Sequence, residues 1–257
     1  MNRIDTLFQQ TPRGILSVYF CAGDPTPAML LPTLHALQEG GVGMVEIGIP
    51  FSDPIADGPV IQNAATRALH NGMSLRRLFR QLRGVRQEIE IPLLLMGYYN
   101  VVLHYGVEKF IDDCAECGID GCIIPDMPFE EYDARYRQYA EGRGVKFVFL
   151  VTPETSDVRI REIDEGTSGF VYAVSSASVT GVQQSFNDAK QAYFARLEAL
   201  ELRNPWLIGF GISNLSTRQA ADRYAHGVIV GSKFVTLLHE LQDPRAATQA
   251  LLEALAS

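Results

Sequence analysis

The sequence predicts an α/β protein that folds as a single (β/α)8 barrel of the TIM type over residues 1–257, with a short N-terminal helix. Eight short apolar segments alternate with amphipathic segments along the chain. Most of the eight have no alternating polar positions, which is typical of strands buried on both faces of a parallel sheet. They recur about every 32 residues, and a chain of 257 residues suits one domain built from eight such units.

The predicted strands are defined by these apolar runs. They are expected at residues 15–21, 44–47, 93–96, 121–124, 146–151, 169–174, 206–210 and 227–230. An open, doubly wound sheet is the alternative, and it would favour G-x-G-x-x-G after the first strand. The first strand is followed instead by A-G-D-P-T-P at 22–27, so the closed barrel is preferred.

The amphipathic segments between the strands carry helix start and stop signals. Thr26 followed by Pro27 is expected to open the first of them, and Gly40-Gly41 to end it. Ser74 and Ser156 are expected to open two further helices. The other predicted helices cover 107–118, 129–142, 192–200, 217–224 and 245–255. Because barrel chemistry lies at the carboxyl ends of the strands, the residues there are the candidates for function.

Composition excludes several classes of function. The net charge is −8, with 22 basic and 30 acidic residues, and no basic stripe suggests nucleic-acid binding. No run of about 18 apolar residues suggests a membrane span, and M-N-R-I-D-T-L-F-Q-Q does not resemble a signal peptide. Four cysteines are too few for a disulfide framework, so a cytoplasmic location is expected. Cys114 and Cys117 form a lone C-x-x-C at helical spacing, so we expect them to face the core and to bind no metal.

The most informative segment is E-I-G-I-P-F-S-D-P-I-A-D-G at 46–58. Glu46 lies inside an otherwise apolar strand, where it is expected to point into the barrel or its mouth. Desolvation there raises the pKa of a carboxyl group. The alternative interpretation of Glu46 is a structural glutamate in an ion pair. For Asp53 and Asp57 the alternative is a role in forming turns, which is common for aspartate in loops. We favour a functional role for Glu46, because buried glutamates without a partner or a task are uncommon.

This segment resembles the signature of the tryptophan synthase α subunit family. The resemblance extends along the chain through A-G-D-P at 22–25, I-Q-N at 61–63, P-D-M-P at 125–128, S-V-T-G at 178–181, G-F-G-I-S at 209–213 and V-G-S at 230–232. It implies cleavage of indole-3-glycerol phosphate to indole and glyceraldehyde 3-phosphate in tryptophan biosynthesis. By the same resemblance Glu46 and Asp57 are the two catalytic carboxylates.

The residue content agrees with that chemistry. A Schiff-base aldolase needs a lysine at a strand end, and a metal-dependent aldolase needs clustered histidines. Neither is evident among the lysines at 109, 146, 190 and 233 or the histidines at 35, 70, 104, 226 and 239. The electron sink is then the substrate, since an indole protonated at C3 accepts the electrons of the breaking bond. Glu46 is assigned to proton transfer and Asp57 to the indole nitrogen, as the family implies.

Backbone groups are expected to bind the phosphate. Gly181, Gly211 and Gly231 follow the last three strands, and Ser232 is expected to be the N-cap of a short helix. The resemblance further assigns substrate contacts to Tyr19, Ile61, Met96, Tyr172, Thr180 and Phe210. Ser176 and Ser178 stand where arginine and glycine are familiar in the family, so closure of that loop is expected to differ. Tyr19 similarly replaces a familiar phenylalanine, and Met96 a leucine.

The partner follows from the resemblance alone. It implies an α2β2 heterotetramer with a β subunit that carries pyridoxal phosphate, while this chain needs no cofactor. The matching surface is expected at Asp53, Pro54, Asn100, Asp126 and Pro128. Two alternatives stay open: another phosphate-binding barrel enzyme, or a non-catalytic barrel that only activates a β subunit. Intact Glu46 and Asp57 argue against the second.

Overall fold

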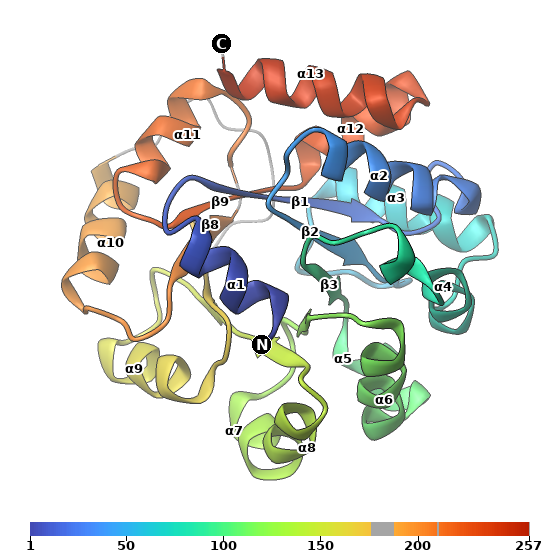
Figure 1. The fold of residues 1–257 in the computed structure, drawn as a ribbon. Helices are drawn as coiled ribbons and strands as arrows, with labels where there is room; N and C mark the ends of the chain where they lie inside the picture. Colours follow the sequence, from blue (N-terminus) through green and yellow to red (C-terminus); the bar gives the residue numbers. More distant parts are fainter. Residues whose placement is uncertain (176–187, 210, 257) are drawn as a thin grey trace.

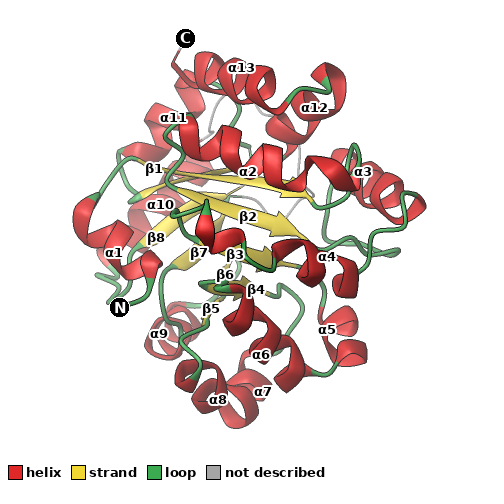
Figure 2. Ribbon diagram, turned by 45° about the vertical axis from the view of Figure 1, so that its right-hand side comes forward, coloured by secondary structure: helices red, strands yellow, loops and turns green. Residues whose placement is uncertain are grey.

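A computed structural model describes residues 1–175, 188–209 and 211–256. Within these residues, nine parallel strands form one sheet in the order β5-β4-β3-β2-β1-β9-β8-β7-β6. The edge strands β5 (Lys146–Val148) and β6 (Leu150–Val151) are separated only by Phe149. The chain therefore closes the sheet into a barrel, and helices surround it (Figures 1 and 2). The other strands are β1 (Ile15–Cys21), β2 (Met44–Gly48), β3 (Leu93–Met96), β4 (Gly121–Ile123), β7 (Val171–Val174), β8 (Trp206–Gly209) and β9 (Gly227–Val230).

The predicted strands are confirmed with local differences. The segment 146–151 was expected to be one strand, but Phe149 interrupts it where its hydrogen-bonded neighbour changes from β4 to β7. The sixth strand begins at Val171 and not at residue 169, because Gly169 has φ +109° and is not extended. Position 210, the expected end of the seventh strand, lies outside the described residues.

Most predicted helix starts are also found. Ser74 and Ser156 accept hydrogen bonds from the backbone N–H groups of Arg77 and Arg159, as N-caps do. Two helices that were not predicted, α3 and α5, follow the second and third strands. The helices are α1 (Arg3–Gln10), η1 (Pro27–Met29), α2 (Leu30–Glu39), α3 (Pro59–His70), α4 (Leu75–Leu82), η2 (Val85–Gln87), α5 (Tyr99–Tyr105), α6 (Val107–Cys117), α7 (Phe129–Glu131), η3 (Tyr132–Tyr136), α8 (Arg137–Gly142), α9 (Asp157–Gly166), α10 (Asp188–Ala199), α11 (Leu215–Asp222), α12 (Ser232–Leu241) and α13 (Pro244–Ala256).

The two missed helices have weak sequence signals. Pro59 occupies the first turn of α3, where proline is tolerated, and the N-cap Gly58 before it has no side chain that could signal a helix start. Helix α5 is only seven residues long and begins with a tyrosine. In the described residues, no helix has both the length and the apolar character that crossing a membrane requires.

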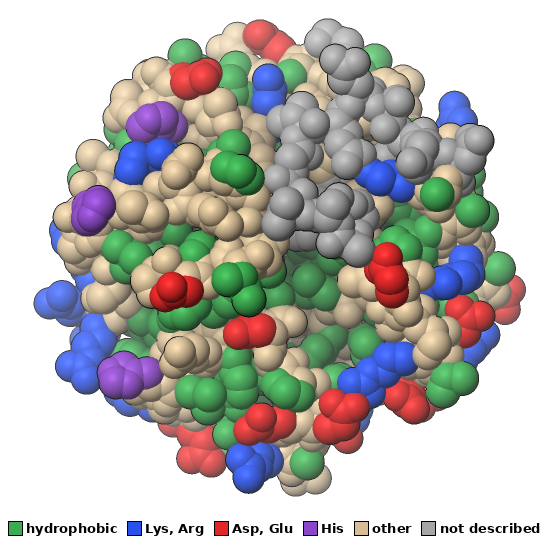
Figure 3. All heavy atoms as spheres, turned by 180° about the vertical axis from the view of Figure 1, so that it is seen from behind, with side chains coloured by type: hydrophobic (Ala, Val, Ile, Leu, Met, Phe, Trp, Pro, Cys, Tyr) green, Lys and Arg blue, Asp and Glu red, His purple; other side chains and the backbone are tan. Residues whose placement is uncertain are grey.

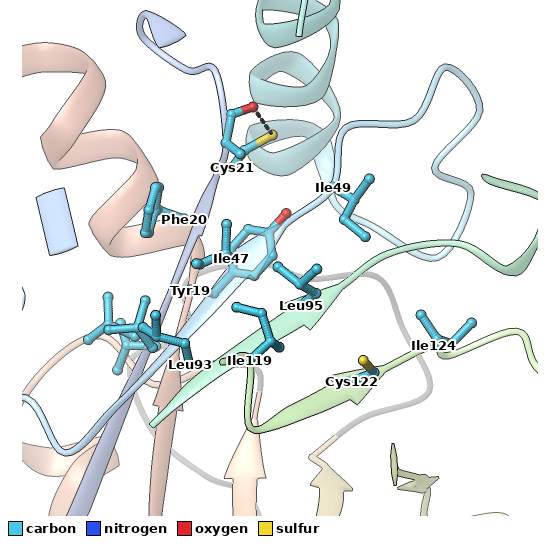
Figure 4. Close-up of a cluster of buried hydrophobic side chains, with 14 of the residues drawn as sticks. Tyr19, Phe20, Cys21, Ile47, Ile49, Leu93, Leu95, Ile119, Cys122 and Ile124 are labelled. Carbon is cyan, nitrogen blue, oxygen red and sulfur yellow. Dashed lines mark hydrogen bonds between the residues drawn. The ribbon is translucent and has the colours of Figure 1, made fainter. Parts of the chain in front are cut away.

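Apolar side chains form two layers. The outer layer packs strands against helices, and Figure 4 shows part of it, including Ile47, Leu95 and Cys122. Cys114 and Cys117 are buried in this layer, as expected. The inner cluster fills the barrel and contains Ile4, Ile15, Met44, Leu94, Ile123, Val148, Phe170, Tyr172, Val174, Leu207 and Ile229. Ile4 comes from α1, so α1 inserts a side chain into the inner cluster. This helix covers the end of the barrel at which the strands begin (Figure 1).

Candidate active site

Glu46 lies in the interior of the barrel. Along β2, Met44 belongs to the inner cluster while Val45 and Ile47 belong to the outer one, so alternation directs Glu46 inward. Its exposed fraction is 0%. The hydroxyl of Ser17 on β1 donates a hydrogen bond of 2.8 Å to Oε1. Among the described residues Oε2 has no hydrogen-bond partner.

Burial controls the acidity of this carboxyl. It raises the pKa of Glu46 to about 8, while the hydrogen bond from Ser17 acts in the opposite direction. The expectation of a raised pKa, made from one polar residue in an apolar strand, is therefore confirmed. No ion pair accounts for Glu46 in the described part of the chain, so the structural alternative loses its main support.

Asp57 lies in the loop that follows β2 and is half-buried. The hydroxyl of Tyr98, just after β3, donates a hydrogen bond of 2.9 Å to Asp57 Oδ2. The same Tyr98 oxygen accepts a hydrogen bond of 3.1 Å from the N–H of Ala56. Burial raises the pKa of Asp57, and the hydrogen bond from Tyr98 opposes that rise. Asp57 thus has a phenol partner that favours its ionised form.

Sequence reasoning did not assign Tyr98 or Gln62 to the site. Gln62 on α3 donates from its side-chain amide to the carbonyls of Asp57 at 2.8 Å and Pro54 at 3.3 Å. The N–H of Asp57 also donates to the Pro54 carbonyl at 3.0 Å. These bonds hold the loop that carries Asp57. The signals in the sequence are the place of Tyr98 after an expected strand and the place of Gln62 in the I-Q-N motif.

Two buried tyrosines contribute to the mouth of the barrel. A Cβ atom on Gly48 would lie 2.2 Å from the Tyr19 hydroxyl, and one on Gly209 would lie 2.3 Å from the Tyr172 ring. Both rings therefore occupy space that only a glycine on the neighbouring strand leaves free. Burial raises the pKa of both phenols, and the nearby Glu46 and Asp57 carboxyls add to the effect.

Other predicted substrate contacts lie at the same end. A Cβ atom on Gly231 would lie 3.6 Å from Tyr19 Cβ and 3.7 Å from Ile61 Cδ1, so these three residues are neighbours. Met96, at the carboxyl end of β3, packs against both apolar clusters. Thr180 and Phe210 lie outside the described residues. Figure 3 shows the face opposite that of Figure 1, where hydrophobic side chains line a hollow near the centre.

The predicted phosphate residues are partly described. Gly211 has φ +80°, a conformation that glycine adopts readily. Gly231 immediately precedes α12, and it, not Ser232, is the N-cap residue. Ser232 was expected to be the N-cap, but it is the first residue of α12 and follows Gly231, whose φ of −115° and ψ of −80° are not helical. Gly181 lies outside the described residues.

The predicted partner residues follow β2, β3 and β4. Asp53, Asn100, Asp126 and Pro128 are exposed, whereas Pro54 is buried. Asp126 Oδ1 accepts a hydrogen bond of 2.7 Å from the N–H of Tyr99, which begins α5. Among the described residues, no group of three or more histidine, cysteine or acidic side chains is arranged to hold a metal ion.

Comparisons of the sequence with known proteins all point to one family. The family model described as "Tryptophan synthase alpha chain" matches residues 7–257. A tryptophan synthase alpha chain from Bacteroides thetaiotaomicron is 56% identical over 255 residues, which is 99% of this chain and 100% of the relative. Another, from Parabacteroides distasonis, is 57% identical and covers 99% of both chains.

Solved structures match along nearly the whole chain. Tryptophan synthase subunit alpha from Legionella pneumophila has a TM-score of 0.88 at 33% identity, covering 99% of this chain and 97% of that one. A chain of the tryptophan synthase complex from Pyrococcus furiosus has a TM-score of 0.85 at 35% identity, covering 95% of this chain and 98% of that one.

Proposed function

Because the chain belongs to the tryptophan synthase alpha chain family and is thus an indole-3-glycerol-phosphate lyase, we propose that Glu46 and Asp57 carry its reaction. The observation that carries the proposal is the Glu46 carboxyl, which is fully buried inside the barrel and has one oxygen without a hydrogen-bond partner among the described residues. Burial without an ion pair disfavours the charged form, so such a group is suited to proton transfer.

In the proposed reaction, Glu46 begins protonated. It gives its proton to C3 of the indole ring, which leaves a positive charge on the ring nitrogen and makes the ring an electron sink. The Glu46 carboxylate then removes the proton from the side-chain hydroxyl. As the aldehyde forms, the bond to C3 breaks and its electrons return to the ring, releasing indole and glyceraldehyde 3-phosphate. Glu46 ends protonated, as it began.

Asp57 stabilises the charge that develops on the ring nitrogen. The hydrogen bond from Tyr98 supports this role, since it favours the carboxylate. The two groups have different surroundings. Among the described residues, Glu46 accepts its hydrogen bond from one hydroxyl inside the barrel, whereas Asp57 is half-buried in the loop after β2 and accepts one from Tyr98. Environments that separate two carboxyls in this way support separate acid and anion roles.

The indole ring is assigned to the tyrosine-lined mouth and the phosphate to backbone groups. Tyr19, Ile61, Met96 and Tyr172 lie at this end of the barrel, and Thr180 and Phe210 complete the proposed contacts. Gly211, Gly231 and the first turn of α12 at Ser232 supply N–H groups and a positive helix end for the phosphate, together with Gly181. The proposed chemistry requires no cofactor on this chain.

We further propose that this chain works with a β subunit, in an α2β2 assembly whose β subunits carry pyridoxal phosphate. Two observations support a partner at the barrel mouth. Asp53, Asn100, Asp126 and Pro128 present an exposed surface there, and a solved relative is described as a tryptophan synthase complex. A cytoplasmic setting is proposed because all four cysteines are free and buried.

Substitution of Glu46 tests the catalytic assignment. Glu46→Gln keeps the size of the side chain but removes the exchangeable acid, so turnover should fall by at least ~10²-fold with little change in KM. The measurement is indole release from indole-3-glycerol phosphate. Glu88→Gln is a matched control, because the Glu88 side chain is 64% exposed and pairs with His35. Near-normal turnover of Glu46→Gln would show that the assignment is wrong.

A further inference from the structure

Ser17 is a polar residue in an apolar layer of the barrel. Its exposed fraction is 0%, and its strand neighbours in register are Met44 on β2 and Ile229 on β9. Both neighbours belong to the inner apolar cluster. In the described residues, the hydroxyl of Ser17 makes a single hydrogen bond, the one of 2.8 Å to Glu46 Oε1. A buried hydroxyl needs a partner, and here the partner is the proposed catalytic group.

The direction of this bond distinguishes the two oxygens of Glu46. A serine hydroxyl has one proton to donate, and it gives that proton to Oε1 when the carboxyl is ionised. If Oε1 took up a proton, the serine proton would lose its acceptor in an apolar layer. A proton on Oε2 leaves the Ser17 bond intact, and Oε2 has no other partner among the described residues.

We propose that Ser17 is a positioning residue for proton transfer: it holds Oε1 of Glu46 and leaves Oε2 as the oxygen that exchanges a proton with the substrate. This inference rests on the proposed function of Glu46. Ser17 itself touches no reacting atom. Its effect is to restrict the carboxyl to one orientation and to stabilise its ionised form, which the second half of the reaction requires.

Ser17 is the group near Glu46 that opposes the effect of burial on the pKa of its carboxyl. Tyr19 on β1 and Tyr172 on β7 are phenols whose pKa values are raised well above the usual range, so both are neutral at working pH. Asp57, in the loop after β2, is a charged group near both tyrosines. In the part of the chain that the structure describes, Ser17 donates a hydrogen bond directly to the carboxyl and lowers its pKa against the effect of burial. Removing the hydroxyl should therefore make the carboxyl a weaker acid.

The test is a titration of Glu46 that does not depend on activity. Protein labelled with glutamate carrying ¹³C at the side-chain carboxyl is titrated by NMR, and Glu46→Gln identifies the Glu46 resonance. In Ser17→Ala this resonance should titrate higher by about one pH unit, as expected for loss of a hydrogen bond to a charged group. The limb of the pH–rate profile on which activity falls as Glu46 loses its proton should move upward equally. Turnover at neutral pH should fall about tenfold with KM within about twofold.

Three further variants complete the experiment. Ser17→Thr keeps a hydroxyl and should restore both the titration and the profile towards wild type. Ser17→Cys retains a weaker donor and a similar volume, so it should raise the pKa of Glu46 by less than Ser17→Ala does. It replaces Ser17→Ala in the test if that variant does not fold. Thr33→Val is the matched control, since Thr33 is equally buried on α2 and its hydroxyl has no partner among the described residues. It should leave the Glu46 titration unchanged.

An unchanged Glu46 titration in Ser17→Ala would overturn the inference even if stability fell, because it would leave Ser17 only a packing role. That outcome would not affect the proposed function if Glu46→Gln is inactive. Conversely, an active Glu46→Gln would remove the catalytic role of Glu46, and with it the role proposed for Ser17, whatever the titration gives.

Discussion

At the scale of single residues, two carboxyl groups acquire different properties from different surroundings. Glu46 is fully buried, and burial raises its pKa to about 8 against the opposing hydrogen bond from Ser17. Asp57 is half-buried, and Tyr98 donates to it from the end of the next strand. An acid that keeps its proton near neutral pH and a nearby anion are what the proposed cleavage requires.

Removing the Tyr98 hydroxyl should disturb Asp57. In Tyr98→Phe the carboxyl loses the donor that lowers its pKa, so the pKa of Asp57 should rise. Because the proposed role needs the ionised form, activity is lost as pH falls through this pKa, and that limb of the pH–rate profile should move upward. Turnover should fall about tenfold. Tyr139→Phe removes a similar phenol–carboxylate bond, 2.9 Å long, between Tyr139 on α8 and Asp112 on α6, and should change neither quantity. Matching profiles for Tyr98→Phe and wild type would contradict this prediction.

The buried Glu46 should also make stability depend on pH. Its pKa is about 8 in the folded protein and 4.5 for an unperturbed glutamate, so the folded state binds the proton more tightly. The contribution of protonated Glu46 to the free energy of unfolding is therefore fully present below pH 4.5. It is lost as pH rises towards 8 and above. Glu46→Gln cannot ionise, so its free energy of unfolding should exceed that of wild type increasingly across this window, by about 1.4 kcal/mol per pH unit at most. Urea denaturation between pH 5 and pH 9 measures the difference, and a constant difference would refute it.

At the scale of elements, α3 holds the two loops that follow β1 and β2. Arg67 on α3 forms a bidentate ion pair with the buried Asp24, at 2.7 Å and 2.9 Å. Asn71, at the C-cap of the same helix, donates to the carbonyls of Gly23 and Pro25. Gln62, near the start of α3, donates hydrogen bonds to the carbonyls of Pro54 and Asp57. One helix thus positions both loops relative to the site.

The loop after β2 should couple the partner surface to Asp57. Asp53 is exposed, yet it precedes Pro54, whose carbonyl accepts hydrogen bonds from the Asp57 N–H and the Gln62 amide. A contact made by Asp53 should therefore move Asp57, and a displacement of ~1 Å can change a rate by ~10²-fold. We predict that a β subunit accelerates the isolated chain and that Asp53→Ala lowers this acceleration more than the basal rate.

Indole release with and without saturating β subunit measures both quantities. Equal fold-activation of Asp53→Ala and wild type would refute the coupling and leave the assignments of Glu46 and Asp57 unaffected. Val158→Ala is the control, because Val158 is an exposed residue at the start of α9, far along the chain from this loop.

At the scale of the whole molecule, packing and ion pairs stabilise the end of the barrel where the strands begin. Helix α1 covers the end where the strands begin, and Lys146 at the start of β5 pairs there with Asp5 at 2.9 Å. Asp120 accepts hydrogen bonds from Arg3, Arg86 and the N–H of Leu93. Lys146 therefore lies at the end of the barrel where the strands begin. The proposed chemistry lies at the other end, as barrel enzymes place it.

Truncation of the α1 side chain inside the barrel should therefore affect stability and not catalysis. Ile4 is 0% exposed and packs in the inner cluster, so Ile4→Ala should lower the free energy of unfolding by about 2–4 kcal/mol. Its KM and turnover at a temperature where it is folded should match wild type. Val158→Ala, at a position 70% exposed, should change stability by less than about 0.5 kcal/mol. A loss of turnover in folded Ile4→Ala would show that the two ends are not separate.

The sequence by itself determined the features that depend on near neighbours. Apolar runs specify the buried strands, Ser74 and Ser156 cap helices through N–H groups three residues ahead, and one glutamate in an apolar run points inward by alternation. Only the tertiary structure decided which groups meet across strands. Ser17 reaches Glu46 and Tyr98 reaches Asp57 over 29 and 41 positions of the chain, and the break at Phe149 occurs where the barrel changes partner strands. The physical reason is that these contacts depend on strand register and barrel closure, which are properties of the assembled sheet and not of any single segment.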